Sequence, residues 1–261
     1  MIVLKTKREL ELMREACRIS ANALKEAGKA IQPGVSTQEI DDIVRKYIQG
    51  QGATPSFLGY GGFPASACIS VNDVVIHGIP SKKQILKSGD IVSVDVGAFI
   101  DGFHGDNAYT FACGDISKEA EALLKATEES LYEGIKQAVA GNRVGDIGNA
   151  VQRYVEDRSY SVVRDFVGHG VGAKLHEDPS VPNYGTAGRG VRLLPGMTIA
   201  IEPMIVAGKH NVRVLDDDWT TVTVDGSLAA HFEHTVAITP NGPVIMTIPD
   251  SEVNYESRSD S

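Results

Sequence analysis

Two aspartates, Asp95 and Asp106, interrupt the apolar stretch GDIVSVDVGAFIDGFHGDNAYTF (residues 89–111). The dipeptide Asp101-Gly102 is typical of a two-residue hairpin turn, so the stretch is expected to form two paired strands. With this turn at the centre, the two aspartates are diagonal neighbours on one face, about 7 Å apart. Two buried carboxylates at that distance repel each other, and two divalent cations roughly 3.5–4 Å apart would fit between them. A surface hairpin with two solvated aspartates is the alternative at this point.

Three further polar side chains stand at the ends or in the middle of apolar segments. Glu202 follows the segment TIAI, Glu233 lies in HFEHTVAI, and His169 lies between glycines in VGHGVG. Any one of them alone is typical of a solvent-facing carboxylate or a structural histidine. Together with Asp95 and Asp106 they form an oxygen-rich set with one imidazole. Such a set suits Mn²⁺, Fe²⁺, Co²⁺ or Zn²⁺ and differs from the thiolate sites of structural zinc.

A thiol nucleophile is a weaker interpretation of the sequence. Cys68 precedes His77 by a few residues, but it lies in an apolar run, which favours a buried and inert thiol. The glycine-rich segments GYGG and GHGVG do not clearly open helices, so they give little support for a phosphate-binding loop. His104 and His234 are expected beside the site, where they would either contact the residues that form it or face solvent.

Apolar periodicity predicts the elements that must position these residues. Helices are expected over residues 7–29, 36–48, 119–140 and 144–156, with a capping box between Ser36 and Glu39. Strands are expected over residues 67–70, 74–79, 91–100, 103–111, 162–167, 197–201, 212–215, 220–224 and 230–238. In the central hairpin Asp95 should pair with Ala108, and Gly97 with Asp106.

The two halves of the chain resemble each other at an offset of 107 positions, which matches Gly34 with Gly141 and Val44 with Val151. The order of the expected elements agrees as well. We therefore predict an internal duplication, with halves of about residues 1–115 and 116–249 that share one sheet. Residues 1–249 are expected to form a single domain, and the polar residues 250–261 a disordered tail.

Composition limits the classes of function. The chain has 261 residues and a formal net charge of −9, which argues against nucleic-acid binding through bulk charge. No apolar run approaches the length of about 18 residues that a membrane span needs, and the N-terminal residues show no apolar signal core. The three scattered cysteines, Cys17, Cys68 and Cys113, are typical of reduced thiols in the cytoplasm.

The chain resembles a type I methionine aminopeptidase over about residues 3–248. The motifs CISVNDVVIHGIP, GDIVSVDVGAFIDGFHGD, GHGVG followed by HEDP, GMTIAIEPM and FEHT occur in the order of that family. The resemblance implies an α+β fold of the pita-bread (creatinase/aminopeptidase) type. In this fold two related α/β halves share a mostly antiparallel, curved sheet with helices on its outer face. Only 31 positions separate Glu202 from Glu233, which leaves no room for the long insertion of type II enzymes.

The resemblance also implies a metal site with two divalent cations per chain (Co, Mn, Fe(II) or Zn). The ligands would be Asp95, Asp106, His169, Glu202 and Glu233. Asp106 and Glu233 would bridge both ions, Asp95 would hold one ion, and His169 and Glu202 the other. A water between the two metals would attack the first peptide carbonyl, with Glu202 as the proton acceptor.

The same resemblance assigns the residues on the substrate side. His77 and His176 would contact the peptide and act in catalysis together with Glu202. The methionine side chain would lie among Tyr60, Phe63, Cys68, His77 and Trp219, with Phe57 at the edge of the pocket. Family members more often carry Cys where Phe57 stands and Phe where Leu175 stands, so a change in pocket shape is expected.

The implied activity is removal of the N-terminal methionine from peptides and nascent proteins with a small second residue. The resemblance favours a cytoplasmic monomer in transient contact with the ribosome, with no nucleic-acid or membrane partner. Two alternatives stay open. An Xaa-Pro aminopeptidase of the same fold usually carries an extra N-terminal domain. A non-catalytic peptide- or ribosome-binding protein of this fold usually lacks metal ligands.

Overall fold

The structure, a computed structural model, describes residues 1–252 of the chain. In this part of the chain the helices are α1 (Lys7–Ala30), α2 (Thr37–Gly50), α3 (Lys118–Gln137), α4 (Val144–Glu156) and the 3₁₀ turns η1 (Tyr60–Gly62) and η2 (Asp250–Glu252). The strands are β1 (Thr54–Pro55), β2 (Ala67–Val71), β3 (Val74–Ile76), β4 (Ile91–Ile100), β5 (Phe103–Ala112), β6 (Ser161–Val162), β7 (Gly168–Gly170), β8 (Glu177–Val181), β9 (Thr198–Ile201), β10 (Met204–Val206), β11 (Val212–Val214), β12 (Thr221–Thr223), β13 (Ala229–His231), β14 (Glu233–Thr239) and β15 (Gly242–Ile245). None of the helices described is long and apolar enough to cross a membrane.

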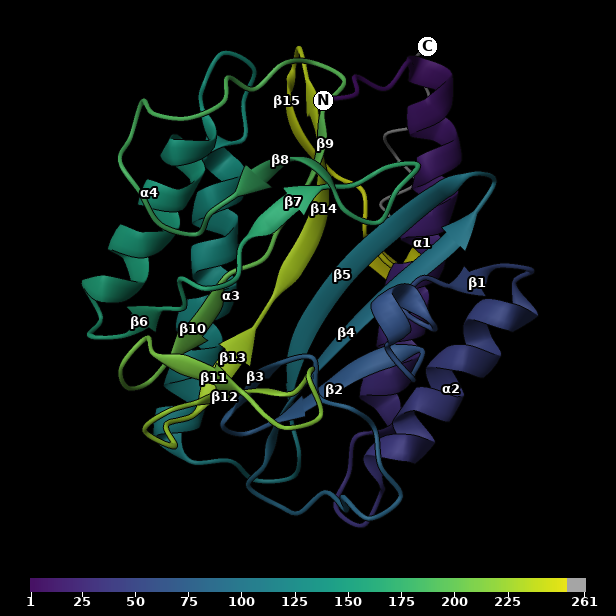
Figure 1. Cartoon of the computed structure of the whole chain (residues 1–261), viewed down its shortest axis with the longest axis vertical. Helices are drawn as coiled ribbons and strands as arrows, with labels where there is room; N and C mark the ends of the chain where they lie inside the picture. The colour runs from purple at the N-terminus through teal and green to yellow at the C-terminus, as the bar shows by residue number, and fades with distance from the viewer. Residues whose placement is uncertain (253–261) are drawn as a thin grey trace.

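A nine-stranded sheet with antiparallel pairings runs through the centre of the molecule (Figure 1). Its main path has the order β1-β4-β5-β14-β9-β7-β8, while β2 pairs with β4 and β15 pairs with β14. Two smaller sheets, β13-β10-β6 and β11-β12-β3, have three strands each. Because β5 belongs to the first half of the chain and β14 to the second, their pairing makes one sheet of both halves.

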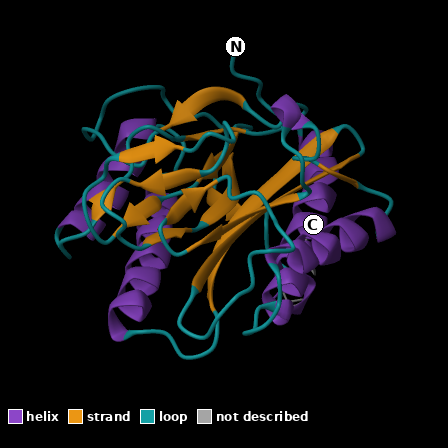
Figure 2. Cartoon of the chain, turned by 60° about the horizontal axis from the view of Figure 1, so that its bottom comes forward, coloured by secondary structure: helices purple, strands orange, loops and turns teal. Residues whose placement is uncertain are grey.

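The two helix pairs cover the two halves of this sheet. Helix α1 contacts β4 and β5 and α2 contacts β2, whereas α3 contacts β9 and β13 and α4 contacts β6 and β8 (Figures 1 and 2). An apolar core lies beneath each pair. The first core includes Val44 of α2 and Val94 of β4, and the second includes Val151 of α4 and Ile199 of β9. The opposite face of the sheet is thereby left for polar side chains.

Local sequence signals set the helix ends. The Thr6 hydroxyl accepts from the N–H of Glu9, and the Glu9 carboxylate accepts from the N–H of Thr6, which caps α1. The predicted capping box between Ser36 and Glu39 starts α2 in the same way. Helix α4 covers the predicted residues, but α3 ends at Gln137 instead of residue 140. There the side-chain amide of Asn142 donates to the Gln137 carbonyl (3.0 Å) and satisfies the helix end.

The predicted offset of 107 positions reappears in backbone contacts. The N–H of Gly34 donates to the carbonyl of Leu86 (2.8 Å), and the N–H of Gly141 donates to that of Leu193 (2.9 Å). Both glycines have positive φ, +95° and +99°. Isolated bridges join residues 36 and 85 in the first half and residues 143 and 192 in the second. The same local structure is therefore built twice, which supports the predicted duplication.

Three predicted strands are wrong in extent. The strand predicted over 74–79 ends at Ile76, because His77 has a left-handed backbone with φ +59°. The strand predicted over 162–167 is reduced to β6, because of the predicted residues only Val162 pairs with β10. The strand predicted over 230–238 is two strands in different sheets, β13 and β14, with Phe232 between them.

The predicted tail begins at residue 250 and falls mostly on residues 253–261, which lie outside the described part of the chain. Of its first residues, Asp250 begins η2, and its carboxylate accepts from Arg18 (2.9 Å) and from the side chain of Asn22 (3.1 Å), both on α1.

Candidate metal centre and substrate pocket

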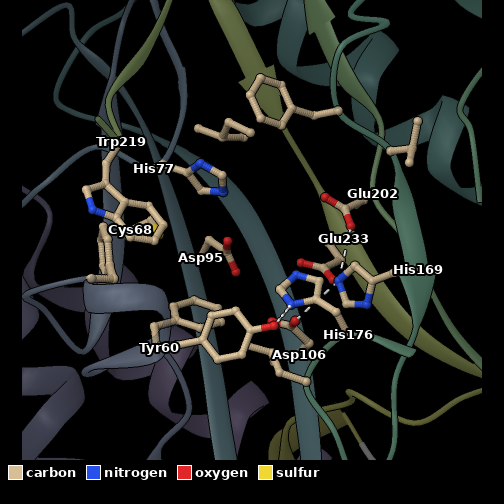
Figure 3. Close-up of a pocket in the computed structure, with 16 residues that line it drawn as sticks. Tyr60, Cys68, His77, Asp95, Asp106, His169, His176, Glu202, Trp219 and Glu233 are labelled. Carbon is tan, nitrogen blue, oxygen red and sulfur yellow. Dashed lines mark hydrogen bonds and ion pairs between the residues drawn. The ribbon is translucent and has the colours of Figure 1, made fainter. Parts of the chain in front are cut away.

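The twelve residues predicted for metal binding, catalysis and substrate binding all line one cavity of about 190 Å³ (Figure 3). They are Phe57, Tyr60, Phe63, Cys68, His77, Asp95, Asp106, His169, His176, Glu202, Trp219 and Glu233. Trp219 and Cys68 lie on the side of the cavity opposite Glu202 and His169 (Figure 3). The cavity thus has a polar, acidic side and an apolar side.

Three neighbouring strands place three carboxylates on one face of the central sheet. Asp95 of β4 pairs with Ala108 of β5, and Ala108 pairs on its other side with Glu233 of β14. Asp106 precedes Ala108 by two residues and therefore points to the same face. The predicted hairpin register, Asp95 with Ala108 and Gly97 with Asp106, is confirmed.

His169 occupies β7 between two glycines that close packing requires. A Cβ on Gly168 would lie 3.0 Å from the carbonyl oxygen of Val181, and one on Gly170 would lie 3.0 Å from the carbonyl oxygen of Glu177. A Cβ on Gly168 would also clash with the carbonyl oxygen of Ala200 in β9. Both positions therefore exclude a side chain, because the backbones of β8 and β9 lie too close to β7. This packing holds the His169 ring in the cavity wall.

Glu202 lies at the break between β9 and β10. Pro203 has no N–H to continue the ladder, so the chain leaves the central sheet at this point. The Glu202 carbonyl accepts from the side-chain amide of buried Asn183 (2.9 Å). The Glu202 carboxylate then reaches to 3.4 Å from Nε2 of His169.

The acidic side of the cavity fits a divalent cation. Ligand atoms of Asp106, His169 and Glu233 all lie within 4.8 Å of one another. Among the described residues, three buried carboxylate oxygens have no hydrogen-bond partner: Oδ1 of Asp95, Oδ1 of Asp106 and Oε1 of Glu233. Buried polar atoms are nearly always paired, and a bound cation would supply the partner that these oxygens lack.

The carboxylates resist ionisation when no cation is bound. Burial, and after it the charge of Asp106, raises the pKa of Asp95 well above its usual value. Burial raises the pKa of Asp106 to about 7. Burial, followed by the charge of Asp106, also raises the pKa values of Glu202 and Glu233 well above normal. A divalent cation would reverse these shifts by favouring the charged forms.

His169 has the tautomer that a metal ligand needs. Its Nδ1 lies 2.8 Å from the carbonyl oxygen of Gly170, and because a carbonyl can only accept, Nδ1 must carry the hydrogen. Burial lowers the pKa of His169 to about 4, so the ring is neutral at pH 7 and Nε2 keeps its lone pair. This Nε2 lies 3.4 Å from Oε1 of Glu202 and 3.8 Å from Oδ2 of Asp106. A hydrogen bond at one nitrogen and a free lone pair at the other is the usual state of a ligating imidazole.

His77 and His176 offer ring nitrogens from different sides of the cavity (Figure 3). The His77 ring packs edge-to-face against Trp219, with 6.0 Å between centroids. Nδ1 of His176 lies 2.7 Å from the hydroxyl of Tyr60, and its ring centroid is 4.1 Å from that of His169. Burial lowers the pKa of His77 to about 4 and also lowers the pKa of His176. Both rings are therefore neutral hydrogen-bonding groups near pH 7.

The apolar side of the cavity is a buried cluster. Phe57, Phe63, Cys68 and Leu175 belong to it, and Trp219 packs against it. The rings of Phe63 and Trp219 meet edge-to-face with 5.1 Å between centroids. Burial raises the pKa of the Cys68 thiol well above normal, as expected for an inert thiol. Such a wall suits an unbranched apolar side chain.

Four residues of this region were not predicted to belong to the site. Ile76, Phe166 and Val167 line the cavity, and His231 lies behind it, with Nε2 3.7 Å from Oε2 of Glu202. No hydrogen-bond partner of this Nε2 occurs in the described part of the chain. The only signal in the sequence was the position of His231 two residues before a carboxylate in an apolar segment.

His104 and His234, expected beside the site, do not line the cavity. The His104 ring bonds with the Ser56 hydroxyl (2.8 Å), and the His234 ring bonds with the Thr247 hydroxyl (2.9 Å). These rings therefore serve local structure.

Comparisons with known proteins agree with this geometry. The model of metallopeptidase family M24 matches residues 11–240. The methionine aminopeptidase of Clostridium acetobutylicum is 54% identical over 248 residues, which covers 95% of this chain and 99% of that protein. Methionine aminopeptidase 1 of Bacillus subtilis is 54% identical over 247 residues, with 95% and 99% covered.

Solved structures confirm the predicted pita-bread fold. The methionine aminopeptidase of Thermotoga maritima superposes with a TM-score of 0.93 at 47% identity, covering 95% of this chain and 99% of that one. The prolidase of Pyrococcus horikoshii has a TM-score of 0.78 at 23% identity, covering 97% of this chain and 66% of that one, and shares the fold alone. This chain therefore belongs to the methionine aminopeptidases of metallopeptidase family M24.

Proposed function

We propose that this chain is a metal-dependent exopeptidase that removes methionine from the N-terminus of peptides and nascent proteins, with preference for a small second residue. The observation that carries the proposal is the single cavity of about 190 Å³ that combines an acidic, histidine-containing side with an apolar side. The cavity is large enough for one amino-acid side chain next to the acidic residues and histidines. An enzyme that recognises only the first residue of a peptide needs a pocket of this size.

Two divalent cations per chain, of Co, Mn, Fe(II) or Zn, would be held by Asp95, Asp106, His169, Glu202 and Glu233. When bound, they would supply Lewis-acid chemistry and a water that ionises near neutral pH. Asp95, Asp106 and Glu233 are suited to this role as ligands, since each has a buried oxygen without a hydrogen-bond partner among the described residues. The single imidazole of His169 and the absence of a thiolate in the set argue for a catalytic site over structural zinc.

The residues that line the cavity would have different roles in binding and cleaving the peptide. Glu202 would accept a proton from the attacking water, since its carboxylate lines the cavity beside the other residues of the set. His176 donates to the oxygen of the first peptide carbonyl, and His77 contacts the nitrogen side of the same bond. Trp219 and Phe63 hold the methionine side chain. A free α-amino group would be attracted by the acidic set, and an internal residue of a peptide has no such group.

We also infer that residues 1–249 act as one domain, as a cytoplasmic monomer in transient contact with the ribosome. Participation of both halves in one sheet supports the single domain. The three cysteines are unpaired and buried, which agrees with a reducing compartment. Size-exclusion chromatography with light scattering tests the monomer, and sedimentation with ribosomes tests the contact.

Hydrolysis of short peptides tests the activity. A Met-Ala-Ser peptide should be cleaved to free methionine with added Mn²⁺, Co²⁺, Fe²⁺ or Zn²⁺, and a chelator should abolish the release. An Ala-Pro peptide distinguishes an Xaa-Pro aminopeptidase, and release of neither product under any metal would indicate a binding protein. Metal analysis of protein purified without oxygen, paired with activity per bound ion, gives the number and identity of the ions.

A further inference from the structure

A buried ion pair joins the N-terminal segment to the loop that carries His176. Nζ of Lys5 lies 2.6 Å from Oε2 of Glu177, and the two side chains are only 3% and 7% exposed. Neither residue belongs to the metal set or lines the substrate cavity. Burying two charges is costly, and a buried pair is weak support for stability by itself. A role in placing neighbouring groups is therefore the more informative explanation.

Each partner of the pair is also bonded to the backbone around it. The N–H of Lys5 donates to the carbonyl of Gly196 (2.7 Å), which fixes the segment beside the central sheet. Oε1 of Glu177 accepts from the N–H of Lys174 (3.1 Å). The Glu177 carboxylate thus closes a tight turn, residues 174–177, and this turn contains His176.

The Lys5 side chain lies directly against Gly172, three residues after His169. A Cβ on Gly172 would lie 2.5 Å from Cε of Lys5 and 2.7 Å from Oε1 of Glu177. Any larger residue at this position would therefore clash with the ion pair. The N–H of Gly172 also donates to the carbonyl at the start of the turn, that of Lys174 (3.0 Å). The ion pair therefore connects the end of the His169 segment with the turn that holds His176.

Among residues 1–252, few other contacts hold the His176 ring from the side of the N-terminal segment. A second cavity, of about 680 Å³, borders His169 and His176 on the side of the N-terminal segment. On the other side the ring bonds with Tyr60, which is 45% exposed, and Gly59 and Gly61 on either side of it have positive φ. The ion pair between the Met1 ammonium and Asp178 is exposed, and such pairs contribute little.

We propose that Lys5 and Glu177 are positioning residues for His176, and that residues 1–6, the N-terminal strap, hold the catalytic ring in place through this ion pair. The inference rests on the proposed function, because it concerns the placement of His176 against the peptide carbonyl. The Lys5 ammonium fixes the Glu177 carboxylate, the carboxylate fixes the turn, and the turn fixes the ring. A small displacement of such a ring lowers the rate of the chemical step much more than it lowers substrate binding.

The test compares three variants of the full chain loaded with Mn²⁺. Lys5→Met keeps most of the apolar stem but removes the ammonium, and Glu177→Gln keeps an acceptor for the N–H of Lys174 but removes the charge. Lys136→Met is the matched control, since it breaks an exposed pair with Glu133. We expect kcat on Met-Ala-Ser to fall about 10- to 100-fold in the first two variants, with KM nearly unchanged and bound metal equal to that of the parent. The control should keep its kcat.

A double-mutant cycle with His176→Ala separates positioning from general damage. If Lys5 acts through His176, Lys5→Met should have no further effect on kcat in the His176→Ala background. Hydrogen exchange of the amides of residues 172–178 in metal-free protein should also speed up in Lys5→Met and Glu177→Gln, while that of β4 stays unchanged. Val151→Ala, a core change in α4, should lower the melting temperature without changing kcat or this exchange.

Full kcat in both single variants would overturn the proposal, and so would losses that multiply in the double variant. If Lys5→Met does not fold, Glu177→Gln alone decides by the same criteria. A parent chain that releases no methionine under any metal would reject the proposed function instead. In that case the exchange of residues 172–178 still tests whether the strap holds the turn.

Discussion

Asp95 and Glu233 come from the two halves of the chain and lie on either side of one small residue, Ala108. Asp95 belongs to β4, Glu233 to β14, and β5 between them contributes only a methyl group at this position. All three residues are nearly buried or lie in the cavity wall. The acidic set therefore sits where the two halves of the sheet meet, and neither half alone could build it.

Removing the charge of Asp106 should remove the metal. In Asp106→Asn we expect metal affinity to drop more than about 100-fold and methionine release to disappear, because the amide is a poor ligand. Without metal, the variant should be more stable than the parent. Its free energy of unfolding near pH 8 should be higher by about 1 kcal/mol or more, because a buried charge has been removed. Metal content after dialysis, turnover and urea unfolding measure the three effects. Asp101→Asn, in the turn of the same hairpin, is the matched control, and unchanged turnover in Asp106→Asn would falsify the site.

The metal-free protein should lose stability as the pH rises above about 7.5. Burial raises the pKa of Asp106 to about 7 and raises those of Asp95, Glu202 and Glu233 well above normal. The folded protein therefore keeps protons that the unfolded chain releases near pH 4. This contribution to the free energy of unfolding is complete below about pH 4 and is lost as the pH rises through the folded pKa values.

Buried histidines do not obscure this effect in the chosen range. Burial lowers the pKa values of His77, His169, His104 and His234 to about 4 and that of His231 to about 3, so these rings are neutral in the folded protein near pH 7. Above about pH 7.5 they are mostly neutral in the unfolded chain as well. Urea unfolding between about pH 7.5 and 9, with and without Mn²⁺, measures the slope. Saturating metal should raise stability most at the alkaline end, where the ligands are already ionised. A stability of the metal-free protein that rises over this range would contradict the assignment.

The apolar wall should set the choice of the first residue. Trp219→Ala removes the ring that packs against Phe63 and opens the cavity. We expect the ratio of kcat/KM for a methionine peptide over that for a phenylalanine peptide to fall by about 10- to 200-fold, since this is the discrimination a pocket loses with its apolar contacts. Leu58→Ala, an exposed residue of the same region outside the cavity, is the control and should keep the ratio. An unchanged ratio in Trp219→Ala would show that Trp219 does not determine the specificity for the first residue.

His231 should support Glu202 in its role as proton acceptor. Its fully buried ring has Nε2 3.7 Å from the Glu202 carboxylate. In His231→Leu, which keeps an apolar side chain of similar size, we expect kcat to fall about tenfold while KM and metal content stay near those of the parent. His210→Leu, in a loop away from the cavity, provides the comparison for loss of an imidazole. Equal kcat values in His231→Leu and His210→Leu would show that His231 does not contribute to catalysis.

Local signals were sufficient for much of the fold. The Asp101-Gly102 turn and the alternation of apolar residues predicted the register of β4 and β5, because a two-residue turn leaves only one pairing. The Ser36 capping box predicted the start of α2, and the offset between Gly34 and Gly141 predicted two equivalent turns. The family resemblance then pointed to twelve residues, and all twelve line one cavity.

Tertiary structure decided what no local pattern contains. The single apolar run of 230–238 divides at Phe232, because β13 and β14 have different partners, β10 and β9. The approach of His231 to Glu202 and the pairing of Lys5 with Glu177, 172 positions apart, depend on how those strands pack. Periodicity reports whether a side chain is buried, but only long-range packing decides which buried side chains meet. By itself, therefore, the sequence determined the elements and the chemical groups, and the folded chain determined which of those groups touch.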